Sequence, residues 1–209
     1  MRAVRHWTPR YIVNRAYGEF YCRTKPDRPW LTPQANSIIE SALRPTDCGL
    51  EFGSGRSTVW LARRLHHLTS VEHNPAWYNV ISDKITNDCF GNVEYLLRSE
   101  TGTPGGNADS DYARTALQFD DKSLDFVLVD GICRDHCARL ALPKIRSGGL
   151  LVIDNVERYL PSDSRSPNSR TQTQGADGPV WSEVMETLKT WRRVWTSSAV
   201  WDTAIFFKP

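Results

Sequence analysis

Two acidic residues and a pair of glycines stand close together in this sequence, at points where short apolar runs end. Glu51 precedes Gly53-Ser54-Gly55, and Glu72 closes the next apolar run. Glycines at a strand-to-helix turn let a ligand approach the backbone closely, because they carry no Cβ. A carboxylate that ends the second strand can accept hydrogen bonds from both hydroxyls of a ribose. The spacing therefore predicts a nucleoside-bearing cofactor on a doubly wound α/β sheet.

A second group of polar residues follows two later apolar runs. Asp130 ends one of them, and Asp154 and Asn155 end the other. The carboxyl ends of adjacent parallel strands meet at one edge of a sheet, where open α/β sheets bind their ligands. We therefore expect Asp130 and Asp154 to be catalytic. His136 is a third candidate, because it can act as a base near neutral pH if it points into the cleft.

The elements that must position these residues alternate between strand and helix. The apolar patterns predict strands at Cys48–Phe52, His67–Glu72, Val93–Leu97, Leu124–Asp130 and Leu150–Asp154. Helices are expected at Gln34–Leu43, Ser57–Leu65, Pro75–Thr86, Arg134–Lys144 and Val180–Arg193. We expect a turn at Ser147-Gly148-Gly149 and a final hairpin of Trp195–Val200 and Thr203–Lys208, turning at Trp201-Asp202. This alternation predicts one doubly wound sheet with an antiparallel tail.

Two regions lie outside this pattern. Residues 1–33 are aromatic and basic, and we interpret them as an N-terminal arm or cap with a short helix near Asn14–Tyr21. Residues 34–209 then form a single domain. Within it, the polar stretch 161–178 is long enough to be a lid over a binding site. Trp30 and Trp77 are the tryptophans expected beside the pocket.

The totals exclude several classes of protein. A chain of 209 residues with 40% hydrophobic and 24% charged residues has the balance of one soluble domain. The net charge of +2 and the lack of a Lys/Arg block speak against nucleic acid. No apolar run reaches the roughly 18 residues of a membrane span, and no signal peptide opens the chain. We expect a cytoplasmic protein with a small-molecule substrate, and the oligomeric state is left open.

Two alternative chemistries fit the residues less well. A nicotinamide-dependent oxidoreductase needs a third glycine where this chain has Thr58, and Glu51 would repel a pyrophosphate. Glu51 suits a cationic cofactor instead. Cys133, His136 and Cys137 lack the remaining ligands and the spacing of a zinc site.

The motifs, in their order along the chain, resemble those of the class I S-adenosylmethionine-dependent methyltransferases. Glu51–Ser57 resembles the first motif of that family and Ser70–Asn74 the second. Leu124–Gly131 and Ser147–Asn155 resemble the fourth-strand and fifth-strand motifs, and Ala204–Lys208 the last strand. The resemblance implies a Rossmann-like, mostly parallel seven-stranded sheet with an antiparallel last strand and helices on both faces. A catalytically inactive binding module on the same fold is a further alternative.

The resemblance also implies roles in binding S-adenosylmethionine. Glu51 would hold the amino group of the cofactor, Glu72 the ribose hydroxyls, and His73 would lie beside the adenine. Ser99 and Glu100 would flank the adenine ring. The remaining expected contacts come from Gly53, Ser54, Gly55, Ser57 and Asp130.

A narrower similarity concerns the second polar group. Asp130, Asp154 and Asn155 resemble the Mg²⁺ ligands of catechol O-methyltransferase-like enzymes, and their oxygens are of the type that Mg²⁺ prefers. The lysine base of that family is absent, and Arg134 is too basic to replace it. The resemblance implies methyl transfer to a small molecule, with oxygen as the expected acceptor atom and Mg²⁺ as a possible second cofactor.

Overall fold

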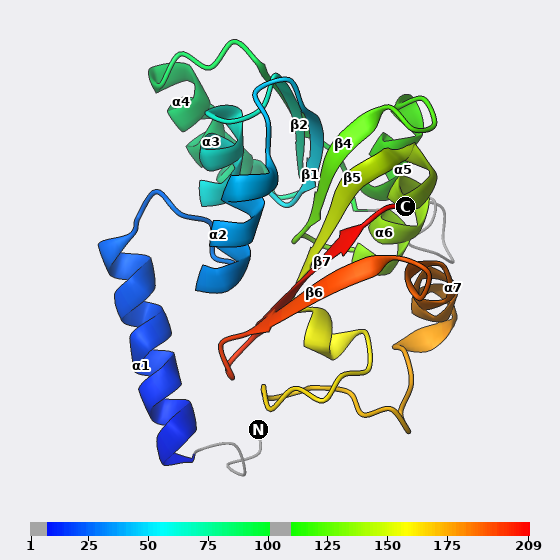
Figure 1. Ribbon diagram of the computed structural model, residues 1–209. Helices are drawn as coiled ribbons and strands as arrows, with labels where there is room; N and C mark the ends of the chain where they lie inside the picture. Colours follow the sequence, from blue (N-terminus) through cyan, green and yellow to red (C-terminus); the bar gives the residue numbers. More distant parts are fainter. Residues whose placement is uncertain (1–7, 101–109) are drawn as a thin grey trace.

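A mixed sheet of seven strands forms the centre of the molecule, as the computed structural model shows for residues 8–100 and 110–209 (Figure 1). Its strand order is β3-β2-β1-β4-β5-β7-β6. The first five strands are parallel, and β7 is antiparallel to both of its neighbours. The strands are β1 (Cys48–Phe52), β2 (His67–Glu72), β3 (Val93–Leu97), β4 (Leu124–Val129), β5 (Ile145–Asp154), β6 (Arg192–Ser197) and β7 (Asp202–Phe207). The predicted fold class is confirmed.

Helices cover both faces of this sheet (Figure 1). Their N-termini follow local sequence signals: Thr32 and Asn74 each cap a helix that begins with proline, whose fixed φ suits the first helical position. The helices are α1 (Pro9–Thr24), α2 (Pro33–Ala42), α3 (Arg56–Ala62), α4 (Pro75–Asn87), α5 (Asp111–Arg114), α6 (Arg134–Ala141) and α7 (Gly178–Leu188). Short 3₁₀ turns are η3 (Thr115–Gln118), η4 (Leu142–Lys144) and η5 (Val156–Arg158). None of the helices in the described ranges is long and apolar enough to cross a membrane.

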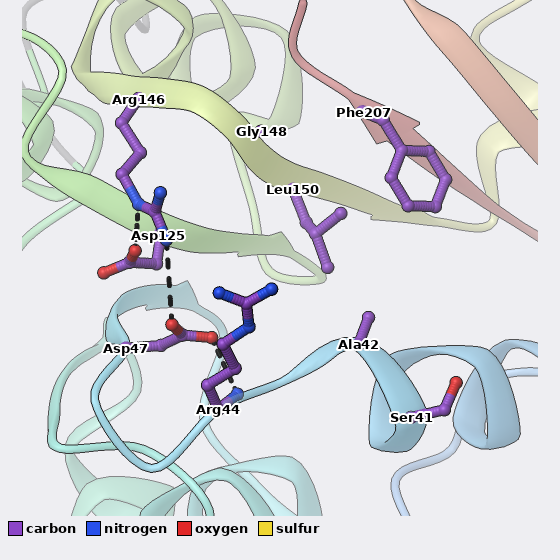
Figure 2. Close-up of a pocket in the computed structure, with 9 residues that line it drawn as sticks. All are labelled: Ser41, Ala42, Arg44, Asp47, Asp125, Arg146, Gly148, Leu150 and Phe207. Atoms are coloured by element: carbon purple, nitrogen blue, oxygen red, sulfur yellow. Dashed lines mark hydrogen bonds and ion pairs between the residues drawn. The ribbon is translucent and has the colours of Figure 1, made fainter.

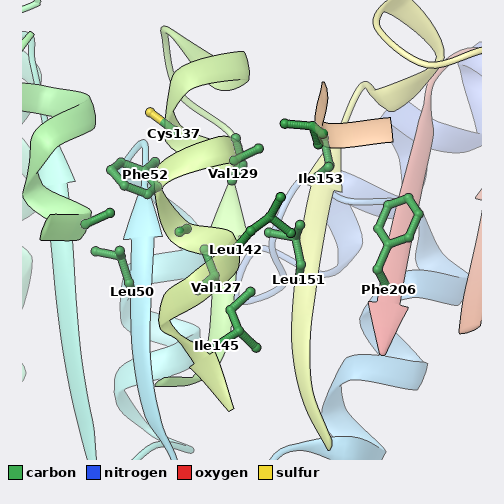
Figure 3. Packing of buried hydrophobic residues seen from close by; sticks show 14 of the residues in the cluster. Leu50, Phe52, Val127, Val129, Cys137, Leu142, Ile145, Leu151, Ile153 and Phe206 are labelled. Carbon is green, nitrogen blue, oxygen red and sulfur yellow. The ribbon is translucent and has the colours of Figure 1, made fainter. Parts of the chain in front are cut away.

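Two hydrophobic cores hold the layers together. Alternate residues of a strand point to opposite faces, so Val127 and Val129 of β4 face α5–α7, whereas Phe126 and Leu128 face α2 and α3. Figure 3 shows the first core, where Phe52, Ile153 and Phe206 pack with Cys137 and Leu142. Burial on both faces explains why the central strands are continuous apolar runs. These cores fix the strand ends that carry the acidic residues.

Several boundaries differ from the predicted ones around β5. The helix predicted at Arg134–Lys144 ends at Ala141 and continues as η4, and β5 begins at Ile145. Ser147-Gly148-Gly149 is therefore part of β5 rather than a turn before it. The register between β4 and β5 shifts between Leu124 and Phe126, and Gly148 has a φ of +78°. This irregularity lets the strand continue through the glycines.

The last helix and the terminal hairpin also differ from the prediction. Helix α7 ends at Leu188, and β6 starts four residues later. The hairpin turns at Ser198–Trp201 rather than at Trp201-Asp202, because Ala199 adopts a left-handed φ of 61° and Asp202 already pairs with Ser197. Likewise α3 ends at Ala62, short of the predicted Leu65.

The N-terminal arm carries a longer helix than predicted. Helix α1 spans Pro9–Thr24, capped by the Thr8 hydroxyl. Gly18 packs on the ring of Trp201 at the hairpin turn, so closely that a Cβ would lie 2.7 Å from it. The guanidinium of Arg56, at the start of α3, donates to the Cys22 carbonyl at 2.8 Å. The second half of α1 therefore contacts both the start of α3 and the hairpin turn.

The polar segment 161–178 is tied to the rest of the domain. Ser166 is buried and donates to Asp202 at 2.5 Å. The backbone of Arg170 bonds to Glu157, and its side chain forms an ion pair with Asp177. The segment thus has fixed anchors at the hairpin and at η5. Its proposed role as a lid stays a prediction.

Candidate active site

The glycine turn after β1 is packed tightly against the end of β4. Gly53 has a φ of +96°, and a Cβ there would lie 2.7 Å from backbone atoms of Gly131. The backbone N–H of Asp130 donates to the Phe52 carbonyl at 2.9 Å. Gly55, by contrast, faces open space, with no atom within 4 Å of where its Cβ would be. The first glycine is thus required by the fold, while the second leaves room for a ligand.

Glu51 is a fully buried acid with one oxygen satisfied and one not. Its Oε2 accepts from the hydroxyls of Thr58 and Ser70, each at 2.6 Å. Its Oε1 is buried without a hydrogen-bond partner. Burial raises the pKa of Glu51 to about 7, against the lowering effect of hydroxyl groups that include Ser57. A buried acceptor without a donor is costly to leave unpaired, so it fits a ligand that brings a cationic donor.

Glu72 is held rigidly at the end of β2. Its Oε1 accepts from the backbone N–H groups of His73 and Asn74 at 2.9 and 2.8 Å. Its Oε2 accepts from the backbone and the hydroxyl of Ser54 at 3.2 and 2.9 Å. A carboxylate offers about four acceptor positions, so a ribose hydroxyl would have to replace the Ser54 hydroxyl. The Ser54 hydroxyl is also hydrogen-bonded to the Tyr95 hydroxyl at 2.7 Å, so it would keep a partner if a ligand displaced it from Glu72.

Aromatic residues surround these two acids. The indole N–H of Trp77 donates to the Ser54 carbonyl at 2.9 Å, and Trp77 is 44% exposed. Trp30 is also exposed and lies under the guanidinium of Arg56. The His73 ring meets Tyr112 edge-on at 6.0 Å. The Tyr112 hydroxyl is buried without a partner, so this corner of the site also has unused hydrogen-bonding capacity.

The remaining predicted cofactor contacts lie around the same strand ends. Ser57 is buried in the first turn of α3. The Ser99 carbonyl accepts from the backbone N–H of Tyr112 at 3.1 Å, and Glu100 is exposed. The structure therefore brings Ser57 to Glu51 and Ser99 to Tyr112.

Asp130 and Asp154 lie at the ends of neighbouring strands, with Arg134 between them. Arg134 donates to the Asp130 carboxylate at 3.0 Å, to the carbonyls of Asp130 and Gly131 at 2.8 Å each, and to the Asp154 carbonyl. The Asp154 carboxyl is buried and accepts from the Thr203 hydroxyl at 2.7 Å. Burial, and then the charge of Asp130, raises the pKa of Asp154 well above its usual range. Burial raises the pKa of Asp130 as well, but the Arg134 guanidinium opposes that rise, so Asp130 gives up its proton more readily than Asp154 does.

This arrangement does not fit the expected Mg²⁺ site. The oxygens that would face a cation already accept from the Arg134 guanidinium, and a fixed positive charge repels a divalent ion. Asn155 sits in a left-handed turn leading into η5. Within residues 8–100 and 110–209, no three His, Cys, Asp or Glu side chains gather as a metal would require. The rejected zinc cluster at Cys133, His136 and Cys137 is not formed either.

His136 is not tied to the acidic pair. Its ring lies 3.4 Å from Arg139 and 3.8 Å from Asp135, both on its own helix. Arg134, and not His136, contacts the Asp130 carboxylate. The geometry thus supports Asp130 more strongly than His136 as a proton acceptor.

Sequence reasoning missed the residues that hold the acids in place. Thr58 and Ser70 donate hydrogen bonds to Glu51, and Arg134 pairs with Asp130. Tyr112, which follows residues 101–109 in the sequence, contacts the His73 ring. Thr58 and Ser70 are polar residues within apolar, buried elements, and this position could have indicated that they bind a buried polar group. No spacing rule pointed to Tyr112.

A hollow of about 400 Å³ lies at the opposite edge of the sheet (Figure 2). Its charged residues pair with one another: the Asp47 carboxylate accepts from the Arg44 backbone, and Arg146 bonds to Asp125. Asp125 also accepts from the backbone of Cys48 at 2.7 Å. These contacts tie together the amino ends of β1, β4 and β5. None of the predicted site residues lines this hollow.

The strand order and the acids at the carboxyl ends define the Rossmann-like class of S-adenosylmethionine-dependent methyltransferases. A family model described as a methyltransferase domain matches residues 50–156, just over half of the chain. The chain belongs to this methyltransferase family. The oxidoreductase alternative is therefore not supported.

Solved structures share the fold. A candidate caffeoyl-CoA O-methyltransferase from Staphylococcus aureus is 17% identical with a TM-score of 0.60, over 94% of this chain and 92% of that one. A methyltransferase-like protein from Silicibacter pomeroyi is 24% identical with a TM-score of 0.55, over 88% and 90%. A candidate methyltransferase from Streptococcus mutans, in complex with S-adenosylhomocysteine, is 10% identical with a TM-score of 0.56, over 84% and 96%. Other matches are described as rRNA methylases. No curated protein matches the chain.

Proposed function

We propose that this protein transfers a methyl group from S-adenosylmethionine to an oxygen of a small-molecule acceptor. The observation that carries the proposal is the buried, unpartnered Oε1 of Glu51, a residue of the strand that leads into the glycine turn, where Gly55 faces open space. The cofactor would bring an ammonium group for that oxygen and, when bound, would supply an electrophilic methyl group on a sulfonium. The fit is supported by the chemistry of the donors and acceptors on both sides of the glycine turn.

Glu51 and Glu72 would bind the two ends of the cofactor. Glu51 is fixed by two hydroxyl groups through Oε2, and its Oε1 is left without a partner. Glu72 is fixed by two backbone N–H groups and presents its other oxygen to the exchangeable Ser54 hydroxyl. Fixed partners at both ends reduce the ordering that binding requires and align the methyl group for attack.

Asp130 is the proposed proton acceptor. Its side chain is 25% exposed and contacts Arg134, whereas its partner Asp154 is buried and holds its proton more strongly. As the acceptor oxygen attacks, the carboxylate of Asp130 would take up the proton that the hydroxyl loses. Arg134 holds that carboxylate in place. His136 stays a less supported alternative.

The proposal that the acceptor is small rests on charge and on the walls of the site. The net charge is only +2, which is a small excess of positive charge for a protein that binds RNA. Helix α1 and the segment 161–178, each anchored at the hairpin, would supply walls that exclude water. Oxygen as the target atom is supported by the carboxylate base and by the Staphylococcus aureus neighbour, a candidate O-methyltransferase.

Calorimetry and turnover test the proposal in two steps. The protein should bind S-adenosylhomocysteine, and NAD⁺ should not compete with it. The chain should then methylate a member of a panel of phenols and hydroxy acids, detected by mass gain, and Asp130→Asn should abolish turnover while retaining cofactor binding.

Three results would count against it. Methylation of amines but not hydroxyls would overturn the choice of oxygen. Methylation of RNA but not of small molecules would overturn the substrate class. Cofactor binding with no turnover on any acceptor would favour the inactive binding module.

A further inference from the structure

Arg134 occupies the centre of the acidic pair in a way that a bound cation would. Its guanidinium donates to four oxygens: one carboxylate oxygen of Asp130 and the carbonyls of Asp130, Gly131 and Asp154. These oxygens come from the ends of two adjacent strands. All are hard oxygen ligands of the kind that Mg²⁺ and Ca²⁺ select.

The surrounding structure holds the Arg134 side chain in this position. Arg134 is the first residue of α6, and its side chain is only 12% exposed. The residue before it, Cys133, adopts a left-handed φ of 46°, which turns the chain so that α6 starts beneath the strand ends. The ring of Tyr159 lies 6.0 Å from the guanidinium. A planar fork with five donors suits several oxygens at once better than an ammonium does.

We infer that the Arg134 guanidinium takes the place of a divalent metal ion, so that this site has a built-in cation and works without a metal. That Arg134 replaces the cation follows from its contacts alone, while the statement that the site works without a metal rests on the proposed methyl transfer. It assigns Arg134 as a positioning residue. It also removes one requirement on the acceptor, because a site whose cation is a guanidinium does not need a substrate that chelates a metal through two oxygens, and a single hydroxyl suffices.

Removing the guanidinium should turn the site into a metal site. In Arg134→Met, the oxygens would remain and the positive charge 3.0 Å from the Asp130 carboxylate would be gone. We expect this variant to bind Mn²⁺ at least about tenfold more tightly than the wild type, because a fixed charge at that range dominates the local field. Loss of the free Mn²⁺ signal in electron paramagnetic resonance measures binding directly, without any activity.

Two matched variants make the test specific. Arg139→Met removes an arginine from the same helix, one that pairs with Glu183 at the surface, and should bind no more Mn²⁺ than the wild type. Adding Asp130→Asn to Arg134→Met should abolish the gained binding. A folded Arg134→Met that gains no Mn²⁺ binding overturns the inference, and so does a wild type that binds Mn²⁺ through Asp130.

A second measurement holds even if Arg134→Met does not fold. Wild-type protein treated with a chelator should keep its melting temperature, and added Mg²⁺ should not raise it. A fall on chelation that Mg²⁺ restores would overturn the inference. If the wild type fails to bind S-adenosylhomocysteine, the proposed function fails while these metal results still decide the role of Arg134.

Discussion

Replacing Glu51 with glutamine should separate the cost of burying this acid from its role in binding. The pKa of Glu51 is raised from 4.5 to about 7 by burial. Each pKa unit is worth about 1.4 kcal/mol, so the difference corresponds to about 3 kcal/mol. Because the folded protein holds the proton more tightly, this stability is fully present below about pH 4.5 and is lost as the pH rises through 7.

A cationic group at Oε1 reverses this preference. The ammonium of the cofactor favours the ionised carboxylate, so binding at lower pH must release a proton. As the pH increases toward 7, we expect the affinity for S-adenosylhomocysteine to rise about tenfold per pH unit, and we expect it to level off above pH 7. Glu51→Gln should lose this pH dependence, and its affinity near pH 8 should fall about 10- to 100-fold, the worth of a charge-assisted hydrogen bond.

Glu157 provides the matched control. It is another buried acid whose pKa is raised to about 7, mainly by burial, but it lies after β5 and accepts from the Asp202 backbone. Glu157→Gln should therefore flatten the pH dependence of the free energy of unfolding, as Glu51→Gln does, yet leave the pH dependence of binding intact. Calorimetry between about pH 5.5 and 8.5 measures both. Binding that shows no pH dependence in the wild type, or the same dependence in Glu51→Gln, would refute the reasoning.

Two other predictions concern the packing of the site. Gly53→Ala should lower the free energy of unfolding by at least about 2 kcal/mol, because residue 53 has a left-handed φ and the new Cβ would collide with the backbone of Gly131. Gly55→Ala should fold normally but weaken cofactor binding at least about tenfold. Urea unfolding and calorimetry measure these effects, and a Gly55→Ala variant that binds like the wild type would contradict the placement of the cofactor. Tyr112→Phe should raise stability by about 1 kcal/mol, since it removes a buried hydroxyl without a partner. A loss of stability in urea unfolding would show that the hydroxyl has a structural role.

The fold was largely predictable because strand burial leaves a strong pattern. β1, β2 and β3 have the predicted bounds, since each is a short apolar run between turn residues or helices. The start of β5 was not predictable, because Ser147-Gly148-Gly149 has turn composition and only the register shift against β4 carries it into the strand. The hairpin turn depends on a left-handed alanine, Ala199, for which the sequence has no signal.

The candidate site was predictable in its acids and not in what holds them. Glu51, Glu72, Asp130 and Asp154 all lie at strand ends, as the alternation of apolar runs and acids required. The spacing of residues along the sequence does not show which groups a long side chain contacts in the folded protein. Arginine is too basic to act as a base, so the sequence indicates no role for Arg134. In the structure, its guanidinium donates to four oxygens at the centre of the site.

A crystal structure with S-adenosylhomocysteine would test the central claim most directly. We predict that the amino group of the ligand lies within hydrogen-bond distance of Glu51 Oε1, directly or through one water. Its ribose hydroxyls should replace the Ser54 hydroxyl at Glu72 Oε2, which is 2.9 Å away in the free protein. A ligand bound elsewhere, with Glu51 still unpartnered and Glu72 still paired to Ser54, would contradict the account.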